Sequence, residues 1–346
     1  MVDYIIVVSN EDDYHAGFHH FAEKVNRKLK SGYQLHGPPF NINQTLCQAM
    51  VSNVGGAAQR RHHDVCEARR LPRLNYTADF TACSFAVFCF HRVMPKAPLA
   101  AIVKHCDRIL RTAAIGDYDG AANGLQVENS GTVTRLAATV DASLATVKLA
   151  IAEKADLLIV HHGLFWSPAQ PWTGKRYEML RLLMANNLAV YSSHLPLDAH
   201  PRLGNNAQLA AALGFKKLKP FFTSHGQAIG FKSQTKISRS ELAARLERAI
   251  GAKPKLLPGG KEICERIGIV TGGAGGDLKL AAAEGVDTFI TGEGPHWTYA
   301  LAEELGLNVF YGGHYATETF GVKALAAELS KKFKLPWAFL DHPTGL

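Results

Sequence analysis

From Met94 onward, runs of apolar residues alternate with amphipathic stretches. The run "RLAATVD" at 135–141 is followed by a helical pattern, by the apolar run "ADLLIV" at 155–160, by a second helical pattern at 177–187 and by "LAVYSS" at 188–193. Short apolar runs suit buried strands, and helical patterns between them are typical of units with parallel strands. We therefore predict an α/β fold for this part of the chain.

The same layout recurs further along the chain. Residues 266–318 read strand, helix, strand, helix, strand, as do residues 135–199, and both stretches end in a histidine with a carboxylate four positions later: His194 with Asp198, and His314 with Glu318. Any two units of this kind look alike, but the shared His-x-x-x-Asp/Glu favours an internal duplication. The fold class expected is two similar βαβαβ lobes forming one body, with lobes at about 94–222 and 223–346.

Polar side chains gather where the predicted strands end. Ligands bind beyond the carboxyl ends of strands in parallel sheets, so these side chains should project into one crevice. Imidazoles and carboxylates that converge there form either a metal site or a proton-transfer site. The set is larger than acid–base work needs, and it suits one crowded metal or two adjacent ones. The residues at or just after strand exits are His161, His162, His194, Asp198, Glu293, His314 and Glu318.

His161 and His162 stand side by side at the end of an apolar run, before Gly163. Adjacent residues on a regular strand point to opposite faces, so both can serve one site only where the strand ends. We expect Gly163 to supply the freedom for that turn. We predict that the two imidazoles bind different metals, or opposite sides of one pair. The alternative is that one of them is a core residue hydrogen-bonded to a backbone carbonyl.

The first 93 residues have a different character. Residues 1–52 read as a small α+β unit of βαββ type, with a strand at "YIIVV" and an amphipathic helix at 18–32. This unit resembles a small bacterial domain family of unknown function, which implies no chemistry. Residues 53–93 contain six arginines and no lysine, and their apolar residues follow no clean period. We predict a poorly structured linker there.

Composition narrows the choice of partners. No apolar run is long enough for a membrane span, and the N-terminus does not read as a signal peptide, so we expect a cytoplasmic protein with no membrane partner. The net charge of +8 would suit nucleic acid, but no nucleic-acid-binding motif is present and we do not expect that partner. The six cysteines form no CxxC pair, which argues against a disulfide framework or a cysteine zinc site.

Residues 94–346 resemble the type 2 GTP cyclohydrolase I homologs, also called NGG-interacting-factor-like proteins. The resemblance rests on "GDYDGAANGLQVE", "LLIVHHGLFW", "SSHLPLDAH" followed by "GNN", and "GGHYATETFG". It implies a toroidal homohexamer and a dinuclear centre with two divalent ions per chain; zinc, manganese and iron fit a site without cysteine. The metal ligands that it implies are His161, His162, Asp198, His314 and Glu318.

Other residues near the predicted strand exits have open roles. His194 is either a ligand or a hydrogen-bond partner that orients Asp198, and we favour the second. The catalytic residues are unknown; Glu293 and His296 are candidates for a general base, and a helix cap is an equal alternative for Glu293. Asp141 is expected to cap the helix that begins near Ser143.

Three further features near the predicted crevice give only weak indications of function. Trp166 and Phe165 suit the core better than a base-stacking role. The stretch "TGGAGGD" at 271–277 lacks the lysine of a phosphate-binding loop and favours a plain tight turn.

Two function classes remain open at this point. One is a metal-dependent hydrolase of a nucleotide-like or phosphorylated metabolite, with a small-molecule substrate; the cyclohydrolase activity in the family's name would be one case. The other is a non-catalytic metal-binding ring with a regulatory, storage or metal-delivery role. A hydrolase needs an open coordination position with bound water, whereas a storage site can be closed.

Overall fold

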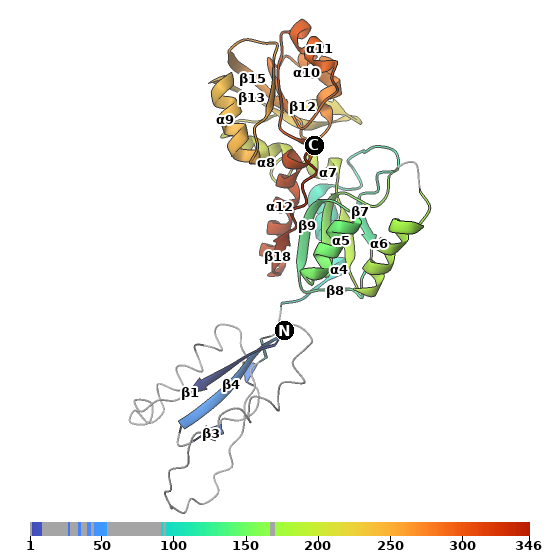
Figure 1. Ribbon diagram of the computed structural model, residues 1–346, viewed down its shortest axis with the longest axis vertical. Coiled ribbons are helices and arrows are strands. Elements are labelled where there is room, and N and C mark those ends of the chain that lie inside the picture. The colour runs from blue at the N-terminus through green and yellow to red at the C-terminus, as the bar shows by residue number, and fades with distance from the viewer. Residues whose placement is uncertain are drawn as a thin grey trace, which may run out of the picture. The chain divides into compact units, whose positions relative to one another are not determined.

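The computed structural model divides the chain into two compact units, Met1–Met94 and Pro95–Leu346. It describes residues 95–166 and 170–346 in full (Figure 1). In the first unit it describes five strands and the helical residue Arg27. The helix expected at 18–32 otherwise lies outside the described residues, as does the linker expected at 53–93 apart from its strand residues.

The strands of the first unit are centred on β4 (Thr45–Asn53). It pairs antiparallel with β1 (Val2–Val8), in a register that runs from Val2 opposite Asn53 to Val8 opposite Cys47. The short strands β2 (Gln34–Leu35), β3 (Phe40–Ile42) and β5 (His91–Arg92) also pair with β4.

The second unit contains two larger sheets. The first sheet has the order β18-β9-β10-β11-β7, in which β7 alone is antiparallel to its neighbour. Its strands are β7 (Gly124–Val127), β9 (Leu136–Asp141), β10 (Leu157–His162), β11 (Ala189–Ser192) and β18 (Trp337–Phe339). A two-stranded ribbon of β6 (Ala97–Pro98) and β8 (Thr132–Val133) lies apart from it.

Helices cover both faces of the first sheet, and this explains its continuous apolar strands. In β10, Leu157 and Ile159 pack in one core with α4 (Leu99–Leu110) and α12 (His314–Phe333). Leu158 and Val160 pack on the opposite side with α5 (Leu144–Ala152) and α6 (Gly174–Ala185). A strand buried on both faces reads as an unbroken apolar run, as the sequence indicated.

The second sheet has the order β12-β13-β15-β16-β17-β14. Its three central strands β15, β16 and β17 are parallel, and the outer strands pair antiparallel. The helices α10 (Leu278–Ala283) and α11 (Thr298–Leu305) pack on one face, and α8 (Asn205–Ala212) and α9 (Arg239–Ile250) pack on the other. The strands are β12 (Lys219–Ser224), β13 (Gln227–Ser238), β14 (Lys255–Pro258), β15 (Ile263–Ile269), β16 (Thr288–Thr291) and β17 (Asn308–Tyr311).

The predicted α/β fold with two similar lobes is confirmed. The units β9–α5–β10–α6–β11 and β15–α10–β16–α11–β17 follow the same strand and helix order, with three parallel strands each. The lobe boundary near residue 222 stays a prediction. None of the described helices combines the length and apolar character needed to span a membrane.

In each lobe, a helix that follows the third parallel strand packs against the sheet of the other lobe. After β11, the chain forms the short helix α7 (Leu195–Asp198) and then α8, whose Leu209 and Ala210 pack against the second sheet. After β17, α12 packs against the first sheet, and β18 joins that sheet beside β9 (Figure 1). The two exchanged helices meet where Asn205 accepts a 2.6 Å hydrogen bond from the backbone of Gly321. This exchange brings the strand exits of both lobes to one place.

Candidate metal centre

The five side chains implied as ligands meet between the two lobes. Glu318 lies at their centre: its Oε2 is 3.2 Å from Nε2 of both His162 and His314, and its Oε1 is 3.5 Å from Nε2 of His161. Asp198 completes the group, with Oδ2 also 3.5 Å from Nε2 of His161. Two residues of β10, the end of α7 and the first turns of α12 therefore contribute to one cluster.

The spacing within this cluster suits ligands that share a cation. Two atoms that are each about 2.1 Å from one ion at a tetrahedral angle lie about 3.4 Å apart. The 3.2 and 3.5 Å separations have this size, and 3.5 Å is long for a hydrogen bond between charged groups. Two sets of three side chains place their ligand atoms within 4.8 Å of one another: His161 with His162 and His194, and His162 with His314 and Glu318.

Each of the four histidines is held through Nδ1 by a separate oxygen acceptor, and the Nε2 atoms of three point at the carboxylates. A metal-binding histidine usually donates its other ring N–H in this way, which fixes the tautomer and ring orientation. The rings of His161 and His194 are 4.9 Å apart between centroids. The Nδ1 partners are the Ser193 carbonyl for His161 at 2.9 Å, Asp141 for His162 at 2.8 Å, Asp117 for His194 at 2.8 Å and Glu293 for His314 at 2.7 Å.

Burial makes the cluster costly without a cation or protons in it. His161 is fully buried, and its Nε2 has no hydrogen-bond partner; Glu318 is 3% exposed, and its Oε2 also lacks one. Burial disfavours the charged form of His161, but Asp198 and Glu318 outweigh it and raise its pKa well above the usual value. The nearby carboxylates of Glu318 and Glu293 raise the pKa of His314 to about 9. Protons on these rings supply the positive charge that a divalent ion would otherwise bring.

A cavity of about 310 Å³ opens onto the cluster. His162, His194, His314, Asp198 and Glu318 form one part of its wall. The rest comes from both lobes and includes the aromatic rings of Tyr118, Trp166 and Phe222. A small molecule in this cavity could therefore contact the ligand cluster and the aromatic rings together.

Asp198 and Asp141 have other hydrogen-bond partners than we expected. Asn205, rather than His194, donates to Asp198 Oδ1 at 2.8 Å. Asp141 binds His162 and does not cap the following helix; Ser143 is the N-cap, in a capping box with Thr146. A carboxylate just before a helix can serve either purpose, and only the position of the neighbouring strand distinguishes them.

Of the two candidates for a general base, only Glu293 contacts the cluster. Glu293 accepts from His314 Nδ1, so it orients a member of the cluster. His296 is exposed and is not among the residues that line the cavity.

Two residues that the sequence analysis left without a role, Asp117 and Asn123, hold His194 in place. Asp117 accepts from His194 and from the side chain of Asn123 at 2.7 Å, and Asn123 accepts from the backbone of His194 at 2.7 Å. Although burial opposes it, the hydrogen bond from His194 helps to lower the pKa of Asp117. The only signal for Asp117 and Asn123 was the glycine-rich "GDYDGAANG" loop. For Asn205 it was the stretch "GNN".

We predicted that Gly163 supplies conformational freedom for a turn, and this prediction is wrong. Its backbone is not in the left-handed region, so conformational freedom is not required there. Instead, a Cβ atom would collide with the side chains of Gln126 and Ser192. Gln126 Oε1 accepts from the Leu164 backbone at 2.7 Å, and this contact holds the chain just after the histidine pair.

The other two sequence features near the site lie as follows. Residues Ala274–Asp277 form a short 3₁₀ turn whose Gly275 donates to the Glu293 carbonyl, so the tight-turn interpretation of "TGGAGGD" holds. The core position expected for Trp166 and Phe165 is wrong. Trp166 lines the cavity, and Phe165 is 37% exposed and packs edge-on against Trp172 at 5.8 Å.

Comparison with known proteins agrees with this geometry. The family model Duf34/NIF3 (NGG1p interacting factor 3) matches residues 98–344. The chain belongs to this family. The match includes all five residues of the cluster and no residue of the first unit. The family predicted from the sequence motifs is thus confirmed.

Individual relatives support the same assignment. A protein of Deinococcus radiodurans named GTP cyclohydrolase 1 type 2 homolog is 42% identical over 235 residues, which are 67% of this chain and 89% of that protein. The crystal structure of TTHA1606 from Thermus thermophilus is 40% identical, with a TM-score of 0.68, and covers 72% of this chain and all of that one. Reduced HcgD from Methanocaldococcus jannaschii is 28% identical, with a TM-score of 0.63, over 71% of this chain and 99% of that one.

Proposed function

We propose that the cluster is a dinuclear metal centre, and that it hydrolyses a nucleotide-like or phosphorylated metabolite. The observation that carries the proposal is the arrangement of histidines around Glu318: each ring is fixed through Nδ1, and three Nε2 atoms lie within 3.5 Å of one buried carboxylate. Histidines and a carboxylate grouped in this way are not expected in a packed core. Burying them costs free energy, and only a bound cation or protons can offset that cost.

The ligands divide naturally between two positions. Glu318 turns one oxygen to His161 and the other to His162 and His314, so it can bridge two ions. Asp198 lies on the side of His161. Two divalent ions bound there would supply Lewis acidity and a water of lowered pKa. We leave zinc, manganese and iron(II) as the candidate metals, since imidazole and carboxylate ligands suit all three.

The rest of the site would orient a substrate and hold the ligands still. Asp117, Asp141 and Glu293 fix the rings of His194, His162 and His314. Tyr118 and Trp166 offer ring faces and edges to an organic substrate, and the cavity is open enough for a small molecule to enter. The open cavity favours a hydrolase over a closed storage site.

The test combines metal analysis with a substrate panel. Freshly purified protein is analysed for metal, loaded separately with zinc, manganese or iron(II), and assayed against nucleotides including GTP and against phosphoesters. Glu318→Gln should lose most of the metal and all turnover, whereas the exposed Glu304→Gln, a matched change, should keep both. Metal in the wild type without turnover of any substrate would contradict the hydrolase. Unchanged metal content in Glu318→Gln would contradict the centre itself.

We also propose that the chain assembles as a homohexamer. The family resemblance supports this, and so do the exposed apolar side chains of Tyr177 and Met184 on α6, which are 57% and 62% exposed. Light scattering on the full chain should give six times the mass of one chain; a stable monomer at micromolar concentration would contradict it.

A further inference from the structure

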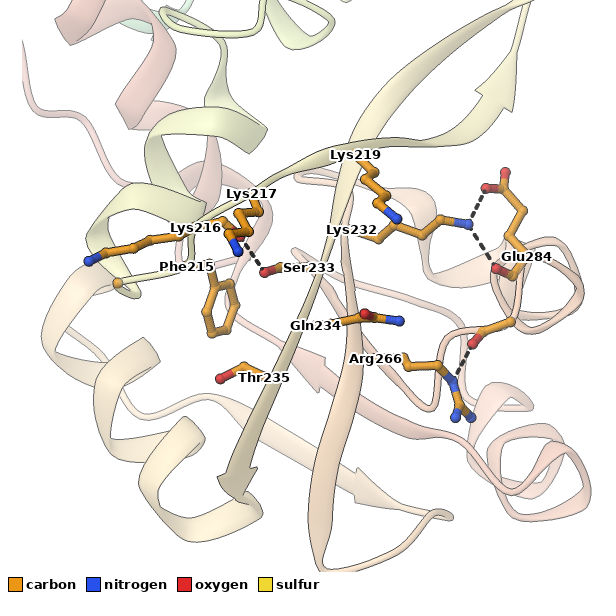
Figure 2. A pocket seen from close by; sticks show the side chains of 12 residues that line it. Phe215, Lys216, Lys217, Lys219, Lys232, Ser233, Gln234, Thr235, Arg266 and Glu284 are labelled. Carbon is orange, nitrogen blue, oxygen red and sulfur yellow. Dashed lines mark hydrogen bonds and ion pairs between the residues drawn. The ribbon is translucent and has the colours of Figure 1, made fainter.

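A second cavity, of about 690 Å³, has five cationic residues and one acidic residue among the twelve that line it. We call it the basic cleft and define it by Lys216, Lys217, Lys219, Lys232, Arg266 and Glu284 (Figure 2). It belongs to the second sheet and shares no lining residue with the cavity at the metal centre. Nothing in the proposed hydrolysis uses it.

The basic cleft and the metal centre lie at opposite ends of the same strands. In β12, Lys219 lines the basic cleft, whereas Phe222 and Ser224 line the other cavity. In β15 and its exit, Arg266 lines the basic cleft and Val270 lines the other cavity. Four residues of extended chain separate those two positions by about 13 Å. A ligand in the basic cleft would therefore occupy a separate site.

Strand register forces like charges together in this cleft. Lys219 is directly opposite Lys232 in the β12–β13 pair, and Gln234 is opposite Arg266 in the β13–β15 pair. Residues 232 and 234 also share a face of the sheet, so all four side chains emerge on one side, as Figure 2 shows. Like charges directly opposite on antiparallel strands destabilise the sheet. A ligand that neutralises them would remove this cost.

Glu284 neutralises only part of the charge. Its Oε2 lies 3.4 Å from Lys232 Nζ, while its Oε1 accepts from the backbone of Phe222 and Thr223. Arg266 is held by the Gly285 carbonyl at 2.6 Å and is 3.6 Å from Asp287. Among the residues that the structure describes, Lys216, Lys217 and Lys219 have no ion-pair partner. The cleft therefore keeps several uncompensated positive charges.

The loop that carries two of these lysines is held in place. Lys217 has a φ of 50°, in the left-handed region that a lysine rarely adopts. The buried Ser233 donates to the carbonyl of Lys216 at 2.9 Å, and Arg245 donates to the carbonyl of Leu213 at 3.3 Å. These contacts fix the loop backbone, so the lysines extend from a pre-formed base.

The lining also indicates which anion fits. Phe215, the aromatic residue of the lining, is 8% exposed, so it offers little surface on which a base could stack or a peptide side chain could anchor. Lysine ammonium groups act as compact point charges and bind phosphate well. The volume exceeds that of a single phosphate and is within the range of small-molecule sites. We propose that the basic cleft binds the polyphosphate group of a small molecule.

The probe for this proposal is inorganic tripolyphosphate, titrated calorimetrically into the full-length protein. Wild type should bind it with one equivalent per chain in the cleft. The double variant Lys217→Ala/Lys219→Ala should bind it at least tenfold more weakly. Lys253→Ala/Lys255→Ala makes the same change of charge at exposed positions near the opposite edge of the sheet and should stay within twofold of wild type.

Two further titrations distinguish binding in the basic cleft from binding at the metal centre and from binding of nucleic acid. Glu318→Gln should leave the cleft affinity unchanged; if binding disappears in that variant but survives in Lys217→Ala/Lys219→Ala, tripolyphosphate binds at the metal centre and the proposal fails. A single-stranded oligonucleotide of ten bases is titrated in parallel. Tighter binding of the oligonucleotide than of tripolyphosphate, abolished by the cleft variant, would overturn the proposal in favour of nucleic acid. If both lysine double variants lose the same amount of tripolyphosphate affinity, the binding is non-specific attraction to net charge and the proposal fails.

Discussion

Gly272→Ala tests the placement of Glu318 in the proposed metal centre without replacing any of the five proposed ligands. Gly272 follows β15 with a φ of 74°. A Cβ atom there would overlap Glu318 Oε1 and would come within 3.1 Å of Cδ and 3.4 Å of His314 Nε2. The backbone cannot easily move away, because the Gly272 carbonyl accepts from Gly292 at 2.8 Å and from Glu293 at 3.0 Å. The Glu318 carboxylate must therefore move.

Two effects of this change can be estimated separately. A left-handed alanine costs about 1–2 kcal/mol, which corresponds to a drop of about 2–8 °C in the melting temperature of a domain close in size to the second unit. Displacing the carboxylate should lower metal affinity by about 10–100-fold, the range seen when groups beside metal ligands are disturbed. The second effect is specific to the centre, whereas the first is a general backbone effect.

The neighbouring glycine provides the control. Gly273 has a φ of −93°, and a Cβ atom there would meet nothing closer than 3.6 Å. Metal affinity is measured by competition with a chelator, and the fold is checked by circular dichroism and thermal melting. Gly272→Ala should lose metal while staying folded, and Gly273→Ala should keep it. Equal metal affinity in both variants would refute the account of Glu318.

Three other outcomes follow from the contacts of the centre. Asp141→Asn leaves the His162 ring without its anionic partner, so metal affinity measured by chelator competition should fall about 10–100-fold with little change in melting temperature. His161→Ala and His162→Ala should each lower the occupancy of one metal position more than the other in elemental analysis; full metal content with a much lower melting temperature would show a purely structural histidine. In metal-free protein, the pKa of about 9 for His314 exceeds its unfolded value near 6.5, so its contribution to stability is complete below pH 6.5 and is lost as the pH rises through 9. Melting temperatures across that window should therefore fall in metal-free protein, and a rise would contradict the charge state assigned to His314.

Local patterns predicted the three parallel strands of each lobe and the convergence of polar side chains at their ends. The apolar run before His161 and the repeated His-x-x-x-Asp/Glu are visible in single stretches of sequence, and the ends of parallel strands meet by geometry. The exchange of α8 and α12 between lobes was not predicted, because it involves contacts between residues far apart in sequence. Asn205 and Gly321, for example, are 116 residues apart.

Long-range partners account for the other differences. Asp117 lies 77 positions before His194 in the sequence, and the glycine-rich loop around it is equally typical of an ordinary turn. The basic cleft depends on strand register, which places Lys219 opposite Lys232 and Arg266 in the next strand. In sequence these residues are ordinary surface cations.

The central claim is that two metal ions bind at Glu318, between His161 on one side and His162 and His314 on the other. Anomalous diffraction from crystals of the metal-loaded protein, recorded at the absorption edge of the bound metal, tests it most directly. We expect two anomalous peaks beside Glu318, each within bonding distance of at least one histidine Nε2. A single peak remote from Glu318, or no peak in protein shown by elemental analysis to contain metal, would contradict the claim.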